Sequence, residues 1–297
     1  MKIRLVSSVM ILMLSVSVIS GCSSNVVEPP EVTIPAEPLY ETYLNLTSSE
    51  GFTLVDRIDW MNTNMMRLSS EEASLVLLDI EDQQLEESFV ILEDLYDLGF
   101  EAIIQTVSIE AIESLDFETD SLELKGRVSE VLSQGYKFVA VEGSFNVIVD
   151  YAFYDGYKAY ATEDVMTYFE LMKTESDNVP LKDAAIVIAW RELFDRTTGW
   201  EKFITNFPES SLYDRANQKL SWYRDWSFNG SPNTPVFEWD TKILTESYRT
   251  GIESYLNQAV PGEFETQMQI FYDMVKENGY KQNDTIEEFQ NKYKVTY

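Results

Sequence analysis

The stretch that decides the fold is SSEEASLVLLDIEDQQLEESFVILEDLYDLG, residues 69–99. Ser69 and Glu72 have the spacing of a capping box, which predicts that a helix begins here. Gly99 is placed to end the same helix. Between them, apolar residues recur at the three-, four- and seven-residue spacing of one helical face, namely Leu75, Leu78, Leu85, Phe89, Leu92 and Tyr96. The opposite face is acidic, so the stretch predicts one long amphipathic helix.

Helical patterns continue along the chain, interrupted by proline and glycine. A shorter helix is predicted over residues 120–134, with short strands possible at 101–107 and 136–141, where β-branched and aromatic residues gather. After residue 162, helices are predicted over 163–175, 181–207, 212–228, 242–257, 263–278 and 285–293. Regularly broken helices of this length predict a mainly α fold, either a bundle of helical hairpins or a solenoid-like array.

The chain contains no histidine and a single cysteine. Imidazole bases, histidine-dependent nucleophiles and the usual zinc and copper ligand sets are therefore excluded. A disulfide within one chain is also excluded. Glycine-rich phosphate loops and the common hydrolase motifs are absent. Carboxylate chemistry and oxygen ligation of calcium or magnesium remain open.

The charge is strongly acidic. Acidic residues number 51 and basic residues 22, for a formal net charge of −29. This charge repels phosphates, which argues against a nucleic-acid partner and against direct adhesion to anionic lipid. Solubility in a salty or alkaline habitat is the preferred explanation of the acidity, and binding of divalent cations or of a basic partner, such as a cationic peptide, is the alternative. Weak association of divalent cations is expected, but a straight helix rarely supplies a calcium site, so no metal site and no cofactor are predicted.

The N-terminus carries a targeting signal. Lys2 and Arg4 precede an apolar stretch, residues 5–18, that is too short for a comfortable membrane span and is typical of a signal peptide. The next residues, Ile19-Ser20-Gly21-Cys22, resemble the lipobox of bacterial lipoproteins. The resemblance implies lipid attachment at Cys22, cleavage before it, and a mature chain anchored on the outer face of the cell membrane. The alternative is an ordinary secretory signal with an incidental cysteine.

Four segments are predicted from these patterns. A signal peptide (1–21) is followed by a spacer (22–47), in which Pro29, Pro30, Pro35 and Pro38 alternate with glutamates and extend the chain. An acidic helical subdomain (48–135) and a helical-hairpin domain (136–297) then follow.

The most site-like residues are aromatic and polar. Aromatic rings with one wet edge beside arginines can line a groove for a sugar or a peptide. The candidate ligand or partner surface comprises Asp150, Tyr151, Tyr154, Trp190, Arg191, Trp222, Arg224 and Trp226. Core packing is the competing interpretation, because Trp190, Leu193 and Phe194 share one helical face. No catalytic residue is predicted.

Two further resemblances concern the second half of the chain. Residues 203–216 read FITNFPESSLYDRA and resemble the turn of tetratricopeptide-type repeats in bacterial envelope lipoproteins, with Phe207 in place of the usual tyrosine. Residues 135–248 resemble helical surface lipoproteins of monoderm bacteria, on the stretches EGS (142–144), VDY (149–151), ESD (175–177), KDAA (182–185), WREL (190–193) and NTP (233–235). These resemblances imply a largely helical fold and bring no activity with them.

The sequence therefore predicts a lipid-anchored, extracytoplasmic helical protein that recognises a protein or peptide and is not an enzyme. One alternative is a substrate-binding lipoprotein of an importer, although that class usually has two α/β lobes. Another alternative is a carboxylate-dependent hydrolase of wall polysaccharide, which requires a cleft with two facing acids.

Overall fold

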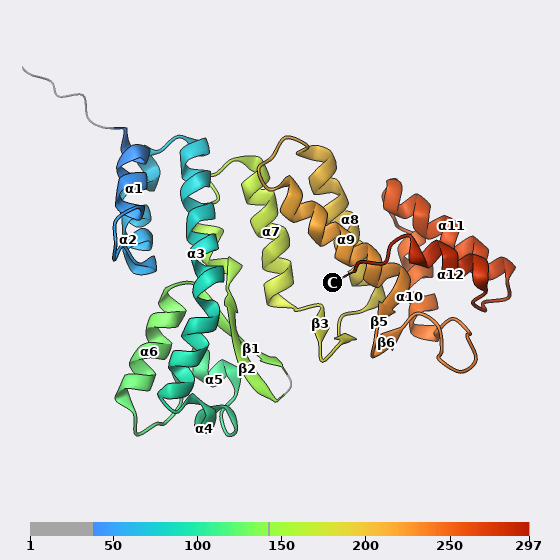
Figure 1. The fold of residues 1–297 in the computed structure, drawn as a ribbon, viewed down its shortest axis with the longest axis horizontal. Helices are drawn as coiled ribbons and strands as arrows, with labels where there is room; N and C mark the ends of the chain where they lie inside the picture. Colours follow the sequence, from blue (N-terminus) through green and yellow to red (C-terminus); the bar gives the residue numbers. More distant parts are fainter. Residues whose placement is uncertain (1–37, 142, 297) are drawn as a thin grey trace, which may run out of the picture. The chain divides into compact units, whose positions relative to one another are not determined.

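The computed structural model describes residues 38–141 and 143–296 (Figure 1). This part of the chain is mainly helical with a few short antiparallel strand pairs, which confirms the predicted fold class. Residues 38–297 form one compact unit. The predicted signal peptide, Cys22 and the spacer up to residue 37 lie outside the described residues.

The first helices are α1 (Leu39–Thr47), α2 (Leu54–Asn64), the 3-10 helix η1 (Met65–Arg67) and α3 (Ser70–Asp97), and two of them begin at a side-chain cap. Thr53 caps α2 and Ser69 caps α3, each in a complete capping box. Gly99 follows α3 with a φ of 91°, a left-handed conformation that favours glycine. The predicted long helix is confirmed at both ends.

Helix α1 occupies the end of the predicted spacer. Tyr43 of α1 is buried, its ring centroid lies 4.7 Å from that of Trp60, and its hydroxyl donates to Asp79. Apolar residues follow Pro38 at helical spacing and pack on α2 and α3. The spacer prediction is therefore wrong for residues 39–47.

Three short helices and a β-hairpin follow α3: α4 (Phe100–Ile104), α5 (Ile109–Glu113), α6 (Leu122–Ser133), β1 (Tyr136–Val141) and β2 (Ser144–Val149). The strand predicted at residues 101–107 is wrong. Phe100 and Ile103 are buried three residues apart, which is a helical and not an alternating spacing. The helix at 120–134 and the strand at 136–141 are confirmed as α6 and β1.

The middle of the chain contains the 3-10 helix η2 (Tyr151–Tyr157), α7 (Glu163–Asp177), β3 (Leu181–Lys182), β4 (Ala185–Ile186), α8 (Trp190–Asn206) and α9 (Tyr213–Asn229). The helix predicted over 181–207 begins only at Trp190. Asp183 and Ala184 have φ values of 51° and 56°, the geometry of a two-residue hairpin turn. Asn233 holds this turn by donating to both of their carbonyls.

The elbow predicted between α8 and α9 is present. Pro208 lies between the helices, and the Phe207 ring centroid is 5.3 Å from that of Phe203. Ser210 Oγ accepts the Leu212 amide at 3.2 Å and donates to Asp164 at 2.5 Å. The two helices pack closely as a helical hairpin.

The chain ends with β5 (Gly230–Ser231), β6 (Thr234–Pro235), α10 (Glu246–Leu256), α11 (Glu263–Glu277) and α12 (Asp284–Asn291). The helix predicted from residue 242 starts four residues late, because Lys242 has a φ of 58° and Leu244 bridges to Phe237. Helix α10 lies so close to α8 that a Cβ at Gly251 would be 2.4 Å from Trp190 Cβ.

The predicted subdomain boundary falls at residues 135 and 136, between α6 and β1. These two elements contact each other, β1 contacts α5, and β2 contacts α3. The hairpin therefore packs on the helices that precede it in the chain, within the same compact unit.

Candidate functional site

An apolar groove runs along β2, between α3 and the segment that follows α7. It consists of two adjoining cavities of about 430 Å³ and 220 Å³, which share Leu85, Ile148, Val149 and Val179. We call it the β2 groove. It is lined by Leu85, Ser88, Phe89, Leu92, Val139, Val141, Asn146, Val147, Ile148, Val149, Tyr151, Met172, Glu175, Ser176, Val179, Pro180, Leu181 and Lys219.

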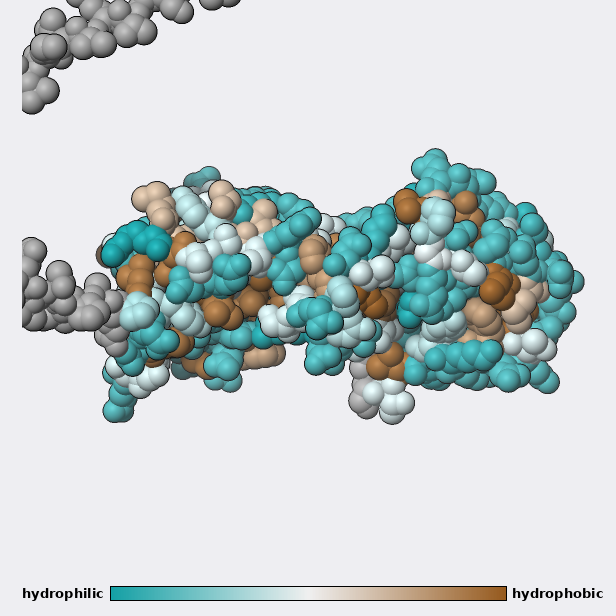
Figure 2. All heavy atoms as spheres, turned by 90° about the horizontal axis from the view of Figure 1, so that it is seen from above, coloured by the Kyte–Doolittle hydropathy of each residue, from teal (hydrophilic) through white to brown (hydrophobic). Residues whose placement is uncertain are grey.

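Helix α3 has two apolar faces. The groove is lined by Leu85, Phe89 and Leu92, which belong to the periodic apolar stripe predicted from the sequence. On the face that Figure 2 shows, hydrophobic residues form separate patches in a mainly hydrophilic surface. Along α3, Leu85 is 45% and Phe89 80% exposed. The fully buried face carries Val76, Leu77, Ile80, Ile91 and Leu95. The periodic stripe from Leu75 to Tyr96 is thus largely a surface feature.

The edge of β2 that faces away from β1 is covered by the rest of the unit. The Asp150 amide donates to the Gly135 carbonyl at 2.8 Å, and the pairing register continues this ladder through every second residue. The amides and carbonyls of Phe145, Val147 and Val149 therefore point away from β1. These three residues are only 8%, 6% and 3% exposed, and α3 contacts β2, so this edge is not open to solvent. On the opposite edge, the Phe138 amide of β1 donates to Glu113 at 3.0 Å.

A buried carboxylate lies beneath one end of the groove. Glu81 of α3 is fully buried, and it accepts hydrogen bonds from Tyr151 at 2.5 Å and from Tyr168 at 3.0 Å. The partly exposed Arg215 of α9 forms salt bridges with both acids: its Nη1 lies 3.3 Å from Glu81 Oε2, and its Nη2 lies 2.6 Å from Asp82 Oδ1. Because Tyr151 lines the groove, this network supports the groove floor.

Burial raises the pKa of Glu81, and Asp82 adds to the rise, while the hydrogen bonds from the two tyrosines and the charge of Arg215 act in the other direction. A folded-state pKa above that of the unfolded chain means that protonation of Glu81 favours folding. The stability that Glu81 contributes is then full at acid pH and is lost as the pH rises through its folded-state pKa.

The variant Glu81→Gln tests whether the pKa of Glu81 is raised in the folded state. We expect the wild type to gain stability relative to the variant as the pH falls from neutral toward the ordinary glutamate pKa of about 4.3. Urea unfolding across this pH range gives the free energy of unfolding of both proteins. The titration of the other carboxylates is common to both and cancels in the difference between them. A difference that stays constant with pH would contradict the assignment.

A second polar pair lies at the same end of the groove. Glu175 of α7 is mostly buried and accepts a hydrogen bond from the Trp200 indole at 3.2 Å. Lys219 of α9 approaches its other oxygen at 3.7 Å. Both Glu175 and Lys219 line the groove, so this end offers one cation and one anion beside an otherwise apolar surface.

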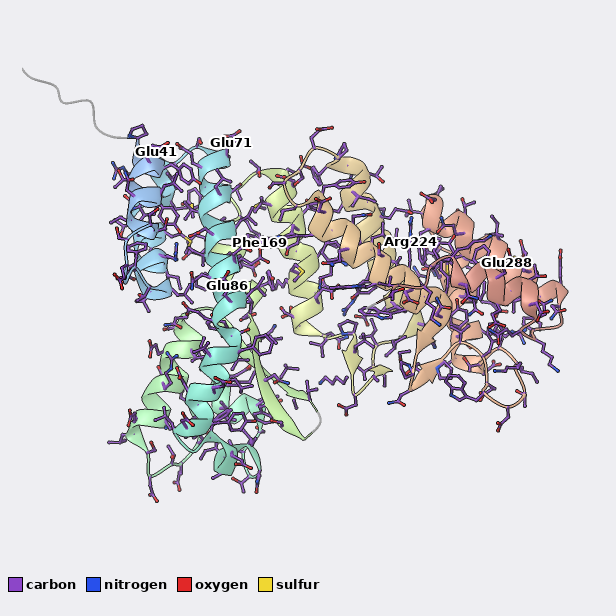
Figure 3. All side chains as sticks on the ribbon, in the orientation of Figure 1. Glu41, Glu71, Glu86, Phe169, Arg224 and Glu288 are labelled. Atoms are coloured by element: carbon purple, nitrogen blue, oxygen red, sulfur yellow. The ribbon has the colours of Figure 1, made fainter. Side chains whose placement is uncertain are left out.

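The first three predicted site residues lie under and beside the groove. Tyr151 lines it, whereas Tyr154 is buried, donates to Gln84 at 2.6 Å and stacks on Phe169 with ring centroids 4.2 Å apart. Phe169 is labelled on α7 in Figure 3. Asp150 caps η2, and its Oδ1 lies 3.3 Å from Lys137 Nζ.

The two predicted residues of α8 lie elsewhere in the unit. Trp190 is buried against Tyr248, with ring centroids 4.7 Å apart. Arg191 donates to Asp195 at 2.8 Å and to the Ser254 carbonyl at 2.6 Å. Their contacts fit the core-packing interpretation and tie α8 to α10.

The three predicted residues of α9 have structural partners of their own. Arg224, labelled in Figure 3, donates to Glu201 at 2.9 Å. Trp226 packs on Tyr223, with ring centroids 5.0 Å apart, and Trp222 lies under Lys219. Within the described residues, no hydrogen bond or ring contact joins these residues to Trp190 or to Tyr151.

The acidic face of α3 is partly neutralised by bases from distant parts of the sequence. Asp79 pairs with Arg57 at 2.6 Å, Asp82 with Arg215, and Asp94 with Arg127 at 3.1 Å. In the described part of the chain, no group of three or more acidic or thiol side chains is arranged to hold a metal ion. None of the described helices has the length and apolar composition needed to cross a membrane.

Of the residues that line the groove, the candidate list contains only Tyr151 and misses the others, among them Phe89 and the segment around Val179. Phe89 and Val90 do stand out in the sequence as adjacent bulky apolar residues, and both are exposed, at 80% and 56%. No protein-family pattern, curated protein or solved structure matches this chain.

Proposed function

We propose that this chain is a lipid-anchored protein of the outer face of the cell membrane that binds a protein or peptide partner in the β2 groove. The observation that carries the proposal is the exposure of Phe89, 80%, at the wall of an apolar groove. A large aromatic ring beside a contiguous apolar surface is typical of an interaction site.

The chemistry of the groove favours binding over catalysis. Its larger cavity is lined by valine, leucine, isoleucine and phenylalanine with two neutral polar residues, Ser88 and Asn146. Glu175 is engaged by Trp200 and Lys219. We therefore propose an interaction module that is not an enzyme and needs no cofactor.

Site-specific photocrosslinking in cells tests the binding site. A benzophenone amino acid at Phe89 is expected to capture a partner, because this position lines the groove. The matched control is the same amino acid at Val90, which is 56% exposed on the same helix but does not line the groove. Equal adducts at both positions, or none at Phe89, would contradict the proposal.

The anchor is tested by Cys22→Ser. Because lipid attachment requires the thiol, we expect the variant to move from the membrane fraction to the soluble fraction of the cell or medium. Fractionation and immunoblotting measure the shift, with Ser24→Ala as the matched control. A variant that stays in the membrane fraction would show that Cys22 is not the anchor.

A further inference from the structure

We propose a second binding site, for a saccharide that carries a carboxylate, among the C-terminal elements. It is a cavity of about 260 Å³ lined by the loop from β6 to α10, by helix α12 and by the residues that flank α12 (Figure 1). We call it the α12 cavity. None of its lining residues lines the β2 groove, so this site is independent of the proposed protein or peptide partner.

The loop between β6 and α10 is held in place by main-chain hydrogen bonds. Within the loop, the Glu238 amide donates to the Ile243 carbonyl at 2.8 Å, and the Lys242 amide donates to the Glu238 carbonyl at 3.0 Å. The Gln282 amide donates to the Lys242 carbonyl at 2.8 Å and ties the loop to the segment before α12. A loop fixed in this way holds its side chains ready, so a ligand would have little chain to order.

The exposed ring of Trp239 supplies an apolar face. Trp239 lines the cavity and is 65% exposed, although tryptophan is highly buried on average in folded proteins. A pyranose ring presents C–H groups on its flat faces, and these can pack on an aromatic ring through dispersion. The ring of Trp239 is therefore a platform on which one sugar unit can stack.

Amide side chains supply partners for sugar hydroxyls. Gln290 is buried, and its Nε2 donates to the Phe228 carbonyl while its Oε1 accepts from Gln282 Nε2 at 2.7 Å. This contact fixes Gln282 at the cavity wall. The Gln282 Oε1 and the side-chain amide of Asn291 have no hydrogen-bond partner within the described residues, and both residues line the cavity. An amide both donates and accepts, as a hydroxyl does, so the wall suits a sugar.

Two lysines add positive charge to the same wall. Lys242 and Lys294 are exposed, line the cavity and form no salt bridge within the described residues, in a chain with 51 acidic and 22 basic residues. Lys242 Nζ lies 5.9 Å from the centroid of the Trp239 ring, so the charge and the apolar face are adjacent. Among the described lining residues the one acid is Glu287. The excess of lysine favours an anionic group on the ligand.

The acidity of the chain favours a carboxylate over a phosphate. A phosphate monoester carries about two negative charges at neutral pH, and Glu287 together with the net charge of −29 opposes the larger charge. Hydrolysis of a glycosidic bond usually requires a pair of carboxyl groups, whereas Glu287 is alone among the lining residues of this cavity that the structure describes. The cavity therefore suits a saccharide that is bound and not cleaved.

Isothermal titration calorimetry on the purified full chain tests the inference with three probes. The first is tetragalacturonate, for which we expect saturable binding. The second is its methyl ester, which keeps the sugar rings and removes the charge. The third is tetraglutamate, which keeps the charge and lacks the rings. We expect binding of the ester and of tetraglutamate to be weaker than binding of tetragalacturonate by at least about fivefold and tenfold, respectively.

Variants of exposed residues locate the site. Trp239→Ala is expected to weaken binding of tetragalacturonate by at least about tenfold, because the stacking platform is lost. Lys294→Gln is expected to weaken it by about two- to fivefold, the range of an exposed charge pair. The matched control is Lys292→Gln, because Lys292 is also exposed and close in sequence but does not line the cavity. We expect this control to bind as the wild type does.

Contrary results would overturn the inference in distinguishable ways. Absence of saturable binding of tetragalacturonate would overturn it as a whole. Equal binding of the ester would overturn the role of the carboxylate, and equal binding of tetraglutamate would overturn the saccharide. Unchanged binding by Trp239→Ala, or equal losses in the two lysine variants, would overturn the placement in the α12 cavity. Crosslinking at Phe89 tests the proposed function separately, so either conclusion can fail without the other.

Discussion

Phe228→Ala is expected to cost about 3–5 kcal/mol of stability, the usual range for removing a fully buried phenylalanine. Phe228 of α9 is fully buried, and its ring meets four other aromatic rings, with centroid distances between 4.3 and 5.9 Å. These rings belong to Phe264, Phe271, Phe289 and Tyr293, so the substitution opens a cavity between α9, α11 and the C-terminal residues.

Urea unfolding measures this loss, and Trp239→Ala is the control. Trp239 is 65% exposed, so its removal should change stability by no more than about 0.5 kcal/mol. A loss below about 1 kcal/mol for Phe228→Ala would mean that the surrounding rings close the cavity, and that this cluster does not organise the C-terminal helices.

Phe89→Asp is expected to weaken binding of the partner in the β2 groove by about 10- to 100-fold. Burying a phenylalanine side chain stabilises a complex by about 1.5–3 kcal/mol, and each 1.4 kcal/mol is a factor of about ten. The substitution removes the apolar ring that stands at the wall of the groove.

Val90→Asp separates this loss from a general effect of charge on α3. Both side chains are exposed in the free protein, at 80% and 56%, so each variant should fold with nearly unchanged stability. The Val90 variant should bind about as tightly as the wild type, because Val90 does not line the groove. Equal affinities of the wild type and the Phe89 variant would contradict the placement of the partner.

The parts of the fold that the sequence predicts well are those with local causes. The capping box at Ser69 and Glu72 and the glycine at position 99 act within one helical turn, so both ends of α3 are visible in the sequence. Pro208 and Ser210 likewise act within the α8–α9 turn. The mainly α class follows from many such signals.

The parts that the sequence misses depend on distant residues. The β3–β4 turn is held by Asn233, fifty residues further along the chain, and no local pattern at residues 181–186 reveals this partner. Helix α4 follows Gly99 directly and is fixed by the burial of Phe100. Tertiary contacts override local propensity at both places.

The candidate site shows the same division. An apolar stripe on α3 is evident in the sequence, but only the packing of β2 and α2 decides which stripe is buried and which one lines the groove. Conversely, Trp190 and Trp226 have the composition of a ligand site and serve as core contacts. Residue type alone cannot separate these roles.

Amide hydrogen exchange of the full chain, with and without the partner captured at Phe89, tests the central claim most directly. Leu85, Phe89 and Leu92 of α3 line the β2 groove, whereas no residue of α12 lines it. With saturating partner, we expect exchange in this part of α3 and in β2 to slow by at least about tenfold and exchange in α12 to stay unchanged. Unchanged exchange along the groove in the presence of bound partner would contradict the account.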